Sequence, residues 1–399
     1  MTDLAALQAL DRAHVMPTYG DRTVAFVRGE GSKLWDTTGK EYLDFLGGLA
    51  VIALGHAHPE VARTLTEQAS TLIHTSNLFL NEHAPELAAT LDDLLGGGGE
   101  VFFSNSGAEA NECAFKTARR FGIVHGGRTD IVAAYGSFHG RTMATLAATG
   151  QPEKHEPFQP LPPGFRHVLF DDLDALANAL DDRVAAVVLE PIQGEGGVHP
   201  ASAEYLQSVR TLCDERGVLL ILDEIQTGLG RTGRWFGFEH AGIQPDIVTM
   251  AKALGNGVPI GACWARREVA EVMTKGLHGT TYGGQPLVAA VARTVLDVMH
   301  REDVCTRARE TGKYFTDALL AVDGVIAVRG AGLLLGAELA EGIAAPEVYA
   351  RCLEGGLVVN AVTPTALRFA PSLLVSNDEI DAAVAIVAAA IDDVRGVTA

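Results

Sequence analysis

The sequence predicts an α/β fold built on a mainly parallel β-sheet. Apolar runs of strand length alternate with stretches of helical period through the middle of the chain, which is the pattern of β-α-β units. Several of these runs are almost wholly apolar, as expected for strands that have helices on both faces. The chain has 399 residues, 47% of them hydrophobic. It can therefore bury a large core and is neither a disordered nor a fibrous protein.

The individual elements of the central region follow from these apolar runs. Strands are predicted at Glu100–Ser104, Ile131–Ala134, Val184–Leu189, Val218–Leu222, Ile247–Met250 and Ile260–Ala265. Helices are predicted between them at Ala108–Arg120 and Ala203–Glu215. Four glycines at 96–99 and the proline-rich segment 151–164 interrupt the pattern and predict surface loops.

The two ends of the chain predict a smaller α+β unit. Short alternating segments upstream surround Asp36-Thr-Thr-Gly39, a predicted hairpin turn. From about Val291 the chain is mostly helical, with a predicted strand at Gly332–Leu339. We therefore expect residues 1–60 to join the small domain, residues 61–290 to form the large α/β domain, and residues 291–399 to complete the small domain.

Charge and composition exclude several classes of function. The formal net charge is −19, from 31 Lys and Arg against 50 Asp and Glu, and no basic run interrupts the acidic balance. Nucleic acid is therefore not an expected partner. His56 and His58 lack a second pair of ligands at matching spacing, so no metal is expected either.

Cysteine usage and the start of the chain indicate the compartment. Cys113, Cys213, Cys263, Cys305 and Cys352 form no CxxC pair, which predicts buried thiols in a reducing environment. The first residues lack the basic start and apolar block of a signal peptide, and no apolar run reaches the length of a membrane span. We expect a soluble cytoplasmic protein.

A strand, a turn of small residues and a helix follow one another at residues 100–112. The free N–H groups of such a helix start favour a phosphate, which makes Ser106, Gly107 and Ala108 candidates for an anion site. The alternative is an ordinary helix cap, with Ser106 as the N-cap and Glu109 completing a capping box. Taken alone, this segment favours the cap.

Asp223 follows an apolar strand at the sheet edge where open α/β folds bind ligands. It could hold Mg²⁺ in a nucleotide site, but the chain has no GxxxxGK[ST] motif. The loop Gly228–Gly233 could be a dinucleotide fingerprint, but five residues separate it from the strand and no amphipathic helix follows. In a third interpretation, Asp223 pairs with a protonated pyridine nitrogen.

Lys252 follows the next apolar strand and lies between Ala251 and Ala253. A buried unpaired amine there is costly, whereas a lysine that reaches solvent would be unremarkable in function. The features of these three segments together favour a catalytic role for Lys252. An anion-binding helix start, a strand-end carboxylate and a strand-end lysine are the parts needed to hold a phosphorylated pyridine aldehyde as a Schiff base.

Longer motifs along the chain extend this interpretation. They are SNSGAEANE (104–112), SFHGRT (137–142), LEPIQGEGGV (189–198), LLILDEIQTGLGRTG (219–233), AKALGNGVPIGA (251–262) and HGTTYGGQP (278–286). Together they resemble the class-III, fold-type-I aminotransferases, which depend on pyridoxal 5'-phosphate. Within this class, HTSNLF (74–79), SFHGRT and the overall length are most similar to the acetylornithine aminotransferases. The resemblance spans nearly the whole chain and implies a large PLP-binding domain with a smaller α+β domain from both termini.

The resemblance implies a role for each matching residue around the cofactor. Lys252 would bind the cofactor covalently and shuttle a proton, and Asp223 would hold the proton of the pyridine nitrogen. Gly107 and Ala108, beside Ser106, would bind the phosphate. Phe138 would stack on the ring and Gln226 would approach its hydroxyl. Thr281 would reach the phosphate of the neighbouring subunit, which implies a homodimer with shared active sites.

The same resemblance implies how the substrates are held. Arg141 would bind the α-carboxylate of acetylornithine, and Arg368 that of glutamate or 2-oxoglutarate, because a guanidinium matches a carboxylate with two hydrogen bonds. Glu195 would pair with Arg368 when the long amino donor is bound. Without the flanking motifs, either arginine could equally form a surface salt bridge.

Two positions depart from the family pattern. Thr280-Thr281 stands where Ser-Thr is usual, and Gln285 replaces an asparagine. Thr280 keeps the hydroxyl that would meet the substrate, whereas Gln285 puts the loop geometry in question.

The implied reaction transfers the terminal amino group of N2-acetyl-L-ornithine to 2-oxoglutarate, giving N-acetylglutamate 5-semialdehyde and glutamate in arginine biosynthesis. The alternative is a related ω-aminotransferase acting on ornithine, succinylornithine, succinyl-diaminopimelate or 4-aminobutyrate.

Overall fold

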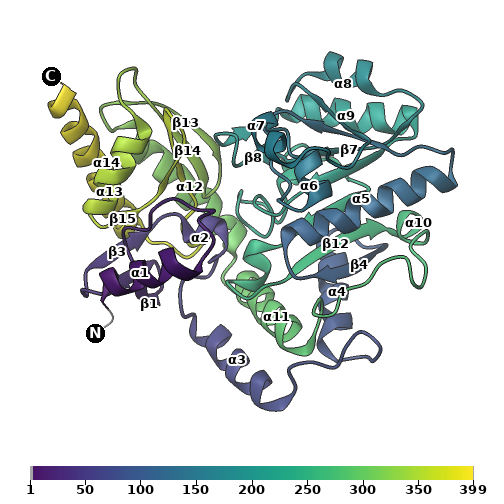
Figure 1. Ribbon diagram of the computed structural model, residues 1–399, viewed down its shortest axis with the longest axis horizontal. Helices are drawn as coiled ribbons and strands as arrows, with labels where there is room; N and C mark the ends of the chain where they lie inside the picture. The colour runs from purple at the N-terminus through teal and green to yellow at the C-terminus, as the bar shows by residue number, and fades with distance from the viewer. Residues whose placement is uncertain (1–2, 399) are drawn as a thin grey trace.

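The computed structural model describes residues 3–398, and its largest β-sheet, here called the central sheet, has seven strands and lies in the right-hand part of Figure 1. Its strands are, in order across the sheet, β4 (Gly99–Ser104), β12 (Gly261–Arg266), β11 (Ile247–Met250), β10 (Leu219–Asp223), β7 (Val184–Leu189), β5 (Asp130–Ala134) and β6 (Phe165–Val168). Strand β12 runs antiparallel to both neighbours, and all other neighbouring pairs in this sheet are parallel. The predicted α/β class with a mainly parallel sheet is therefore confirmed.

Both faces of this sheet are buried, which explains why its strands are so apolar. Leu220 and Leu222 of β10 belong to one hydrophobic core, whereas Leu219 and Ile221 belong to another on the opposite face. Helices that contribute to the first core include α4 (His83–Leu94), α8 (Leu173–Ala179), α9 (Ala203–Arg216) and α11 (Pro286–Arg301). Those that contribute to the second are α5 (Gly107–Val124), α6 (Met143–Ala148) and α10 (Arg267–Ala270). The two predicted helices are confirmed as parts of α5 and α9.

Segments from the two ends of the chain share a second sheet. Its strands are, in order, β1 (Phe26–Glu30), β2 (Lys33–Asp36), β3 (Glu41–Asp44) and β15 (Leu357–Val358). Strands β3 and β15 are parallel, and β2 and β3 form an antiparallel hairpin. The Asp36 carboxylate accepts the backbone N–H groups of Thr38 and Lys40 in the turn, at 2.8 and 3.0 Å. The predicted hairpin turn is confirmed.

A third sheet lies in the C-terminal part of the chain, at the side of the molecule where the first strands also lie (Figure 1). Its strands are, in order, β13 (Val325–Ala331), β14 (Leu334–Leu339), β17 (Ala366–Phe369) and β16 (Asn360–Thr363), and the nearby helices are α12 (Val304–Leu320), α13 (Ala345–Glu354) and α14 (Asn377–Thr398). The strand predicted at Gly332–Leu339 begins two residues too early. Gly332 has a φ of +55° and makes the turn that separates β13 from β14.

A buried arginine joins the loop after β10 to this third sheet. Arg231 is 1% exposed and donates to the backbone carbonyls of Leu333 and Pro371, at 3.1 and 2.5 Å. Burial disfavours the charged guanidinium and lowers its pKa to about 9. Because Leu333 precedes β14 and Pro371 follows β17, one side chain holds three segments together.

The remaining elements are short or lie near the N-terminus. They are α1 (Leu4–His14), α2 (Gly47–Ala50), α3 (Pro59–Thr71), α7 (Pro152–His155), β8 (Ile192–Gln193), β9 (His199–Pro200) and the 3-10 helices η1 (Glu156–Phe158), η2 (Gly237–His240) and η3 (Lys252–Gly255). None of the helices between residues 3 and 398 combines the length and apolar character that a bilayer crossing requires. Residues 1, 2 and 399 of the predicted small-domain segments lie outside the described part of the chain.

Two expectations require correction. The sequence did not predict β6, whose four residues include the polar pair Arg166 and His167 and so lack an apolar run. The cysteines are all free, as expected, but Cys305 is only partly buried because it lies in the first turn of α12, and the other four are buried.

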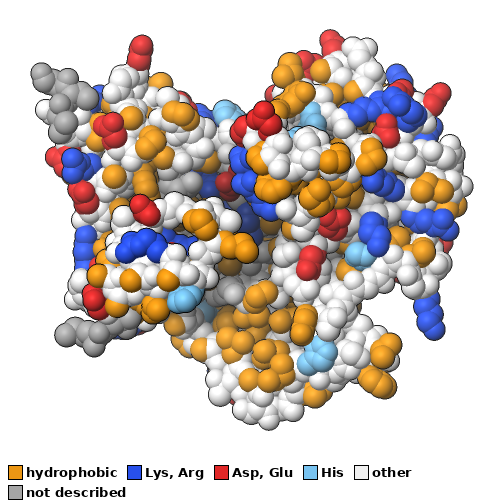
Figure 2. Space-filling view, in the orientation of Figure 1, with side chains coloured by type: hydrophobic (Ala, Val, Ile, Leu, Met, Phe, Trp, Pro, Cys, Tyr) orange, Lys and Arg blue, Asp and Glu red, His pale blue; other side chains and the backbone are white. Residues whose placement is uncertain are grey.

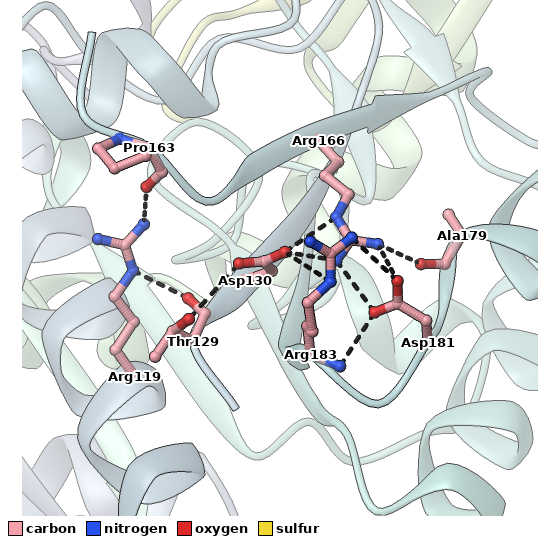
Figure 3. Close-up of polar contacts among 8 residues, drawn as sticks. All are labelled: Arg119, Thr129, Asp130, Pro163, Arg166, Ala179, Asp181 and Arg183. Atoms are coloured by element: carbon pink, nitrogen blue, oxygen red, sulfur yellow. Dashed lines mark hydrogen bonds and ion pairs between the residues drawn. The ribbon is translucent and has the colours of Figure 1, made fainter. Parts of the chain in front are cut away.

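Figure 3 shows an ion-pair cluster at the edge of the central sheet where the parallel strands begin. Arg166 of β6 contacts Asp130 at the start of β5 and Asp181 in the turn before β7. Hydrogen bonding to Asp181 raises the pKa of Arg166, and the same contact holds the pKa of Asp181 well below its usual range. Arg183 also reaches Asp181, at 3.2 Å. The cluster ties three parallel strands together and lies at the edge opposite the carboxyl end of β10.

Candidate active site

A cavity of about 410 Å³ lies where β10 and β11 end and α5 begins. Of the twelve site residues predicted from the sequence, those that line it are Ser106, Gly107, Ala108, Phe138, Arg141, Glu195, Asp223, Gln226 and Lys252. Arg368 lies just behind it and contacts Glu195. Figure 2 shows a hollow in the middle of this face of the molecule, with Lys and Arg side chains beside it.

The first turn of α5 presents free backbone N–H groups to the cavity. Ser106 caps the helix, because its Oγ accepts the N–H of Glu109 at 3.2 Å. Within the described residues, no hydrogen bond uses the backbone N–H of Gly107 or Ala108. A Cβ on Gly107 would lie 2.7 Å from Cδ1 of Ile225, so this position has room for little more than glycine. The helix cap and the anion site are therefore compatible.

Asp223 is held in a fixed orientation at the end of β10. It is 4% exposed, and its Oδ2 accepts hydrogen bonds from Asn111 Nδ2 and His139 Nδ1, both at 2.8 Å. Its Oδ1 accepts the N–H of Ile225 at 3.1 Å. A buried carboxylate with three donors is held in one orientation, which suits it to face a cation in the cavity.

Lys252 follows β11 with a φ of +40°, a conformation that non-glycine residues rarely adopt. Its side chain lines the cavity, and no hydrogen bond within residues 3–398 uses its amine. Burial lowers the pKa of this amine to about 8, although the charges of Glu195 and Asp223 oppose the shift. The structure thus holds a primary amine that is about half neutral near pH 8.

We expect Lys252→Met to stabilise the cofactor-free protein below pH 8. The folded-state pKa lies below the unfolded value near 10.5, so the burial penalty is fully present below pH 8 and is lost as the pH rises from about 8 to 10.5. The expected gain is about 1–3 kcal/mol at pH 7 and close to zero above pH 10.5. Urea unfolding at several pH values measures it. A pH-independent difference between the two proteins would contradict the assignment.

The two arginines of the site differ in their partners. Arg141 is exposed, lies 5.5 Å from the Phe138 ring centroid, and forms no ion pair with any described residue. Arg368 is 1% exposed and contacts Glu195, with its Nε donating to Asn360 Oδ1 at 3.1 Å. Burial raises the pKa of Glu195, but the charge and hydrogen bonds of Arg368 outweigh it and leave this pKa below its usual value.

Thr280 and Thr281 lie outside the cavity of their own chain. The Thr280 hydroxyl accepts from Asn105 Nδ2 at 3.3 Å, and Thr281 is exposed. Gln285, the departure from the family pattern, is 3% exposed, and its Oε1 accepts the N–H of Thr75 at 2.9 Å. This contact ties the segment 72–80 to the loop before α11.

The nucleotide interpretations of this region find no support in the structure. The glycines of the Gly228–Gly233 loop do not line the cavity. A Cβ on Gly230 or Gly233 would instead meet Val304 or Arg309 of α12, at 2.7 and 3.1 Å. These glycines permit close packing of the loop on a helix.

The sequence interpretation missed two residues that shape the site. Asn111 lies one turn into α5 and holds both Asp223 and the carbonyl of His139. Glu190 follows β7, lines the cavity, and accepts the N–H of Phe138 at 3.0 Å. Its burial and the nearby Asp223 raise its pKa well above the usual value. Glu190 follows an apolar strand, as Asp223 does, so the pattern that identified Asp223 could also have identified Glu190.

Comparison with known proteins agrees with this geometry. The sequence model of the class-III aminotransferase family matches residues 15–391. The chain belongs to the class-III aminotransferases. An acetylornithine aminotransferase from Caldanaerobacter subterraneus subsp. tengcongensis is 45% identical, covering 96% of this chain and 99% of that protein. An acetylornithine/succinyldiaminopimelate aminotransferase from Yersinia pestis is 46% identical, covering 92% of each. The structure of an ornithine aminotransferase from Toxoplasma gondii has a TM-score of 0.94 at 34% identity and covers 99% of this chain and 96% of that one.

Class-III aminotransferases use pyridoxal 5'-phosphate, and so does this aminotransferase. The residues present fit that cofactor. The free N–H groups at the start of α5 suit a phosphate, the oriented Asp223 suits a protonated ring nitrogen, and Lys252 offers a primary amine. Phe138 lines the same cavity and offers an aromatic face.

Proposed function

We propose that this aminotransferase transfers the terminal amino group of N2-acetyl-L-ornithine to 2-oxoglutarate in arginine biosynthesis. The products are N-acetylglutamate 5-semialdehyde and glutamate. Two full-length relatives at 45% and 46% identity carry acetylornithine in their names, which supports this donor.

The observation that carries this proposal is that Arg368 forms an ion pair with Glu195, whereas Arg141 forms none with the described residues. Acetylornithine brings one carboxylate, far from the amine that reacts, and Arg141 is a guanidinium without an ion pair among the described residues. The dicarboxylate 2-oxoglutarate brings a second carboxylate, which needs a second cation. Arg368 supplies it when Glu195 releases the guanidinium. One site can thereby accept both substrates in turn.

Lys252 and Asp223 do the central chemistry. When bound, pyridoxal phosphate supplies an electron-accepting ring that stabilises charge at the carbon losing its proton. Lys252 takes that proton at Nζ and returns it, which its lowered pKa favours because the neutral amine is the base. Asp223, held by Asn111 and His139, would present its carboxylate to the ring nitrogen.

The other cavity residues position the substrate and cofactor. The N–H groups of Gly107 and Ala108, next to Ser106, would hold the phosphate. Phe138 would pack on the ring, and its backbone is held by Glu190. Gln226, whose Oε1 accepts from Arg368 at 3.3 Å, lies where it can approach the ring hydroxyl.

We propose that the enzyme is a homodimer with shared sites. Leu78 and Leu80 are 86% and 91% exposed. Asn77, which directly precedes Leu78, donates to the carbonyls of Thr280 and Gly283. Figure 2 shows apolar side chains gathered over α3 and α11. A second copy covering this surface would bury it and bring Thr281 to the phosphate of its neighbour.

We also propose a cytoplasmic location. The free thiols of all five cysteines support a reducing compartment.

We propose that the chain divides into three segments, in which residues 1–60 and 291–399 form the small domain and residues 61–290 the large one. The sheet shared by β3 and β15 supports a small domain built from both ends of the chain.

A panel of amino donors tests the proposed reaction. Steady-state kcat/KM is measured side by side for acetylornithine, ornithine, succinylornithine, succinyl-diaminopimelate and 4-aminobutyrate, with 2-oxoglutarate as acceptor. We expect acetylornithine to give the highest value, by about tenfold over ornithine, because the free α-amine of ornithine brings an additional charge to Arg141. A higher value for another donor would replace the proposed substrate.

Glu195→Gln is expected to raise the ratio of kcat/KM for glutamate over acetylornithine by about tenfold. Without its charge, the side chain no longer competes with a substrate carboxylate for Arg368, and an interaction of this kind contributes about 1.5–3 kcal/mol. Glu338→Gln is the matched control, because Glu338 forms a comparable ion pair with Arg329 outside the cavity. An unchanged ratio for Glu195→Gln would rule out the switching role.

A further inference from the structure

Two cysteines meet in a second, smaller cavity of about 190 Å³. Cys113 comes from α5 and Cys263 from β12, and both side chains line this cavity together with His278. The exposed residues Glu100 and Thr274 also line it and connect it to solvent. It shares no lining residue with the active-site cavity, so neither thiol is part of the proposed transamination machinery.

Polar side chains lie beside Cys113 in this cavity. The Lys116 ammonium donates to the carbonyl of Leu277 and to Nδ1 of His278, both at 2.9 Å. An ammonium only donates, so Nδ1 is an acceptor and the imidazole proton is on Nε2. The N–H of the His278 ring is then a donor in the same cavity as Cys113, and Cys263 lines this cavity and belongs to the same hydrophobic cluster as Cys113. Donor groups beside a sulfur favour its thiolate.

The five cysteines therefore differ in character. The hydrogen bond from Cys263 lowers the pKa of Cys113, with a further contribution from His278, and these outweigh the effect of burial. The same contact raises the pKa of Cys263, which remains a thiol. Burial raises the pKa of Cys213, Cys305 and Cys352 to about 12.

A metal ion does not explain this cluster. Within residues 3–398, no group of three or more His, Cys, Asp and Glu side chains is arranged to hold one. What the cluster offers is a thiolate beside a thiol, in a cavity that opens to solvent and is large enough for a small oxidant.

We propose that Cys113 and Cys263 form an oxidation-sensitive dithiol that hydrogen peroxide converts to a disulfide. The Cys113 thiolate attacks one peroxide oxygen, the O–O bond breaks, and a sulfenic acid and hydroxide form, the hydroxide taking up a proton to become water. The Cys263 sulfur then attacks the Cys113 sulfur, the S–S bond forms, the S–O bond breaks and a second water leaves. Two thiols are oxidised while one peroxide is reduced to two waters.

Peptide mapping of the holoenzyme tests the proposal. The protein is treated with a small excess of hydrogen peroxide, free thiols are blocked with iodoacetamide, and the digest is analysed without reduction. We expect a peptide pair linked through Cys113 and Cys263 that separates on treatment with dithiothreitol. Cys263→Ser should remove the link and leave a sulfenic acid at Cys113 that dimedone traps, whereas the matched control Cys213→Ser should keep the link.

The rate of alkylation supplies a second test that needs no cysteine substitution. At pH 7 we expect Cys113 to react with iodoacetamide at least about tenfold faster than Cys213 or Cys352. His278→Phe should slow Cys113 while the other two rates stay unchanged. The proposal is overturned if peroxide leaves Cys113 free to be alkylated, if it links other cysteines instead, or if Cys113 is no faster than Cys213.

Discussion

Replacing Lys252 with alanine is expected to lower kcat/KM for transamination by about 10⁴-fold. The cavity contains one amine that can take the proton from the substrate carbon, and a positioned base of this kind contributes about 10²–10⁴-fold. Loss of the covalent attachment of the cofactor adds to the effect. Lys252→Arg should be impaired to a similar degree, because a guanidinium keeps the charge but stays protonated.

Activity assays and cofactor mapping together measure this effect. Borohydride treatment of the wild-type holoenzyme should label the peptide that contains Lys252, and the label should be absent from both variants. Lys275→Ala is the matched control, because Lys275 is exposed and does not line the cavity. Activity within tenfold of the wild type in Lys252→Ala, or label on another lysine, would refute the assignment.

Asp223→Asn is expected to lower kcat by about 10²–10³-fold, a loss typical of removing one oriented electrostatic group from an active site. The amide keeps the size of the side chain but not its charge. It also presents an NH₂ group to Asn111 or His139, both of which donate to the carboxylate in the native protein. We expect kcat to fall more than KM changes, because the charge of Asp223 stabilises the transition state rather than the bound substrate.

Asp246→Asn separates this effect from a general loss of stability. Asp246 is also buried, accepts the N–H of Leu220, and pairs with Arg210 and Arg266, but it lies before β11 and outside the cavity. The control should lower the melting temperature and leave kcat nearly unchanged. Equal kcat losses in the two variants would show that the charge of Asp223 has no special role.

Much of the central sheet could be predicted because its strands are buried on both faces. The runs at Val184–Leu189 and Ile247–Met250 match β7 and β11 residue for residue. Strand β6 was not predicted, because it lies at the edge of the sheet, where a strand needs fewer apolar residues. Its Arg166 takes part in the ion-pair cluster. The boundary between β13 and β14 was not predicted, because the single glycine Gly332 makes the turn.

Where a strand end or a helix start fixes the position of a side chain, the sequence could predict which candidate residues lie together. Asp223, Lys252 and the first turn of α5 are placed by local structure, so their meeting in one cavity follows from the topology. Contacts between segments that are distant in the sequence could not be predicted, because no local sequence pattern indicates them. The hydrogen bond from Asn111 to Asp223 and the contact between Cys113 and Cys263 become visible only when the chain is folded.

The position of Arg231 has a consequence for how substrates enter. Its guanidinium donates to carbonyls next to β14 and β17, and it has no carboxylate partner among residues 3–398. Separating these segments would break both hydrogen bonds. We therefore expect the loop after β10 and the third sheet to move as one rigid body rather than about a hinge. Exchange of one substrate for the next then depends on rotamer changes at the cavity mouth, which are faster and smaller than domain opening.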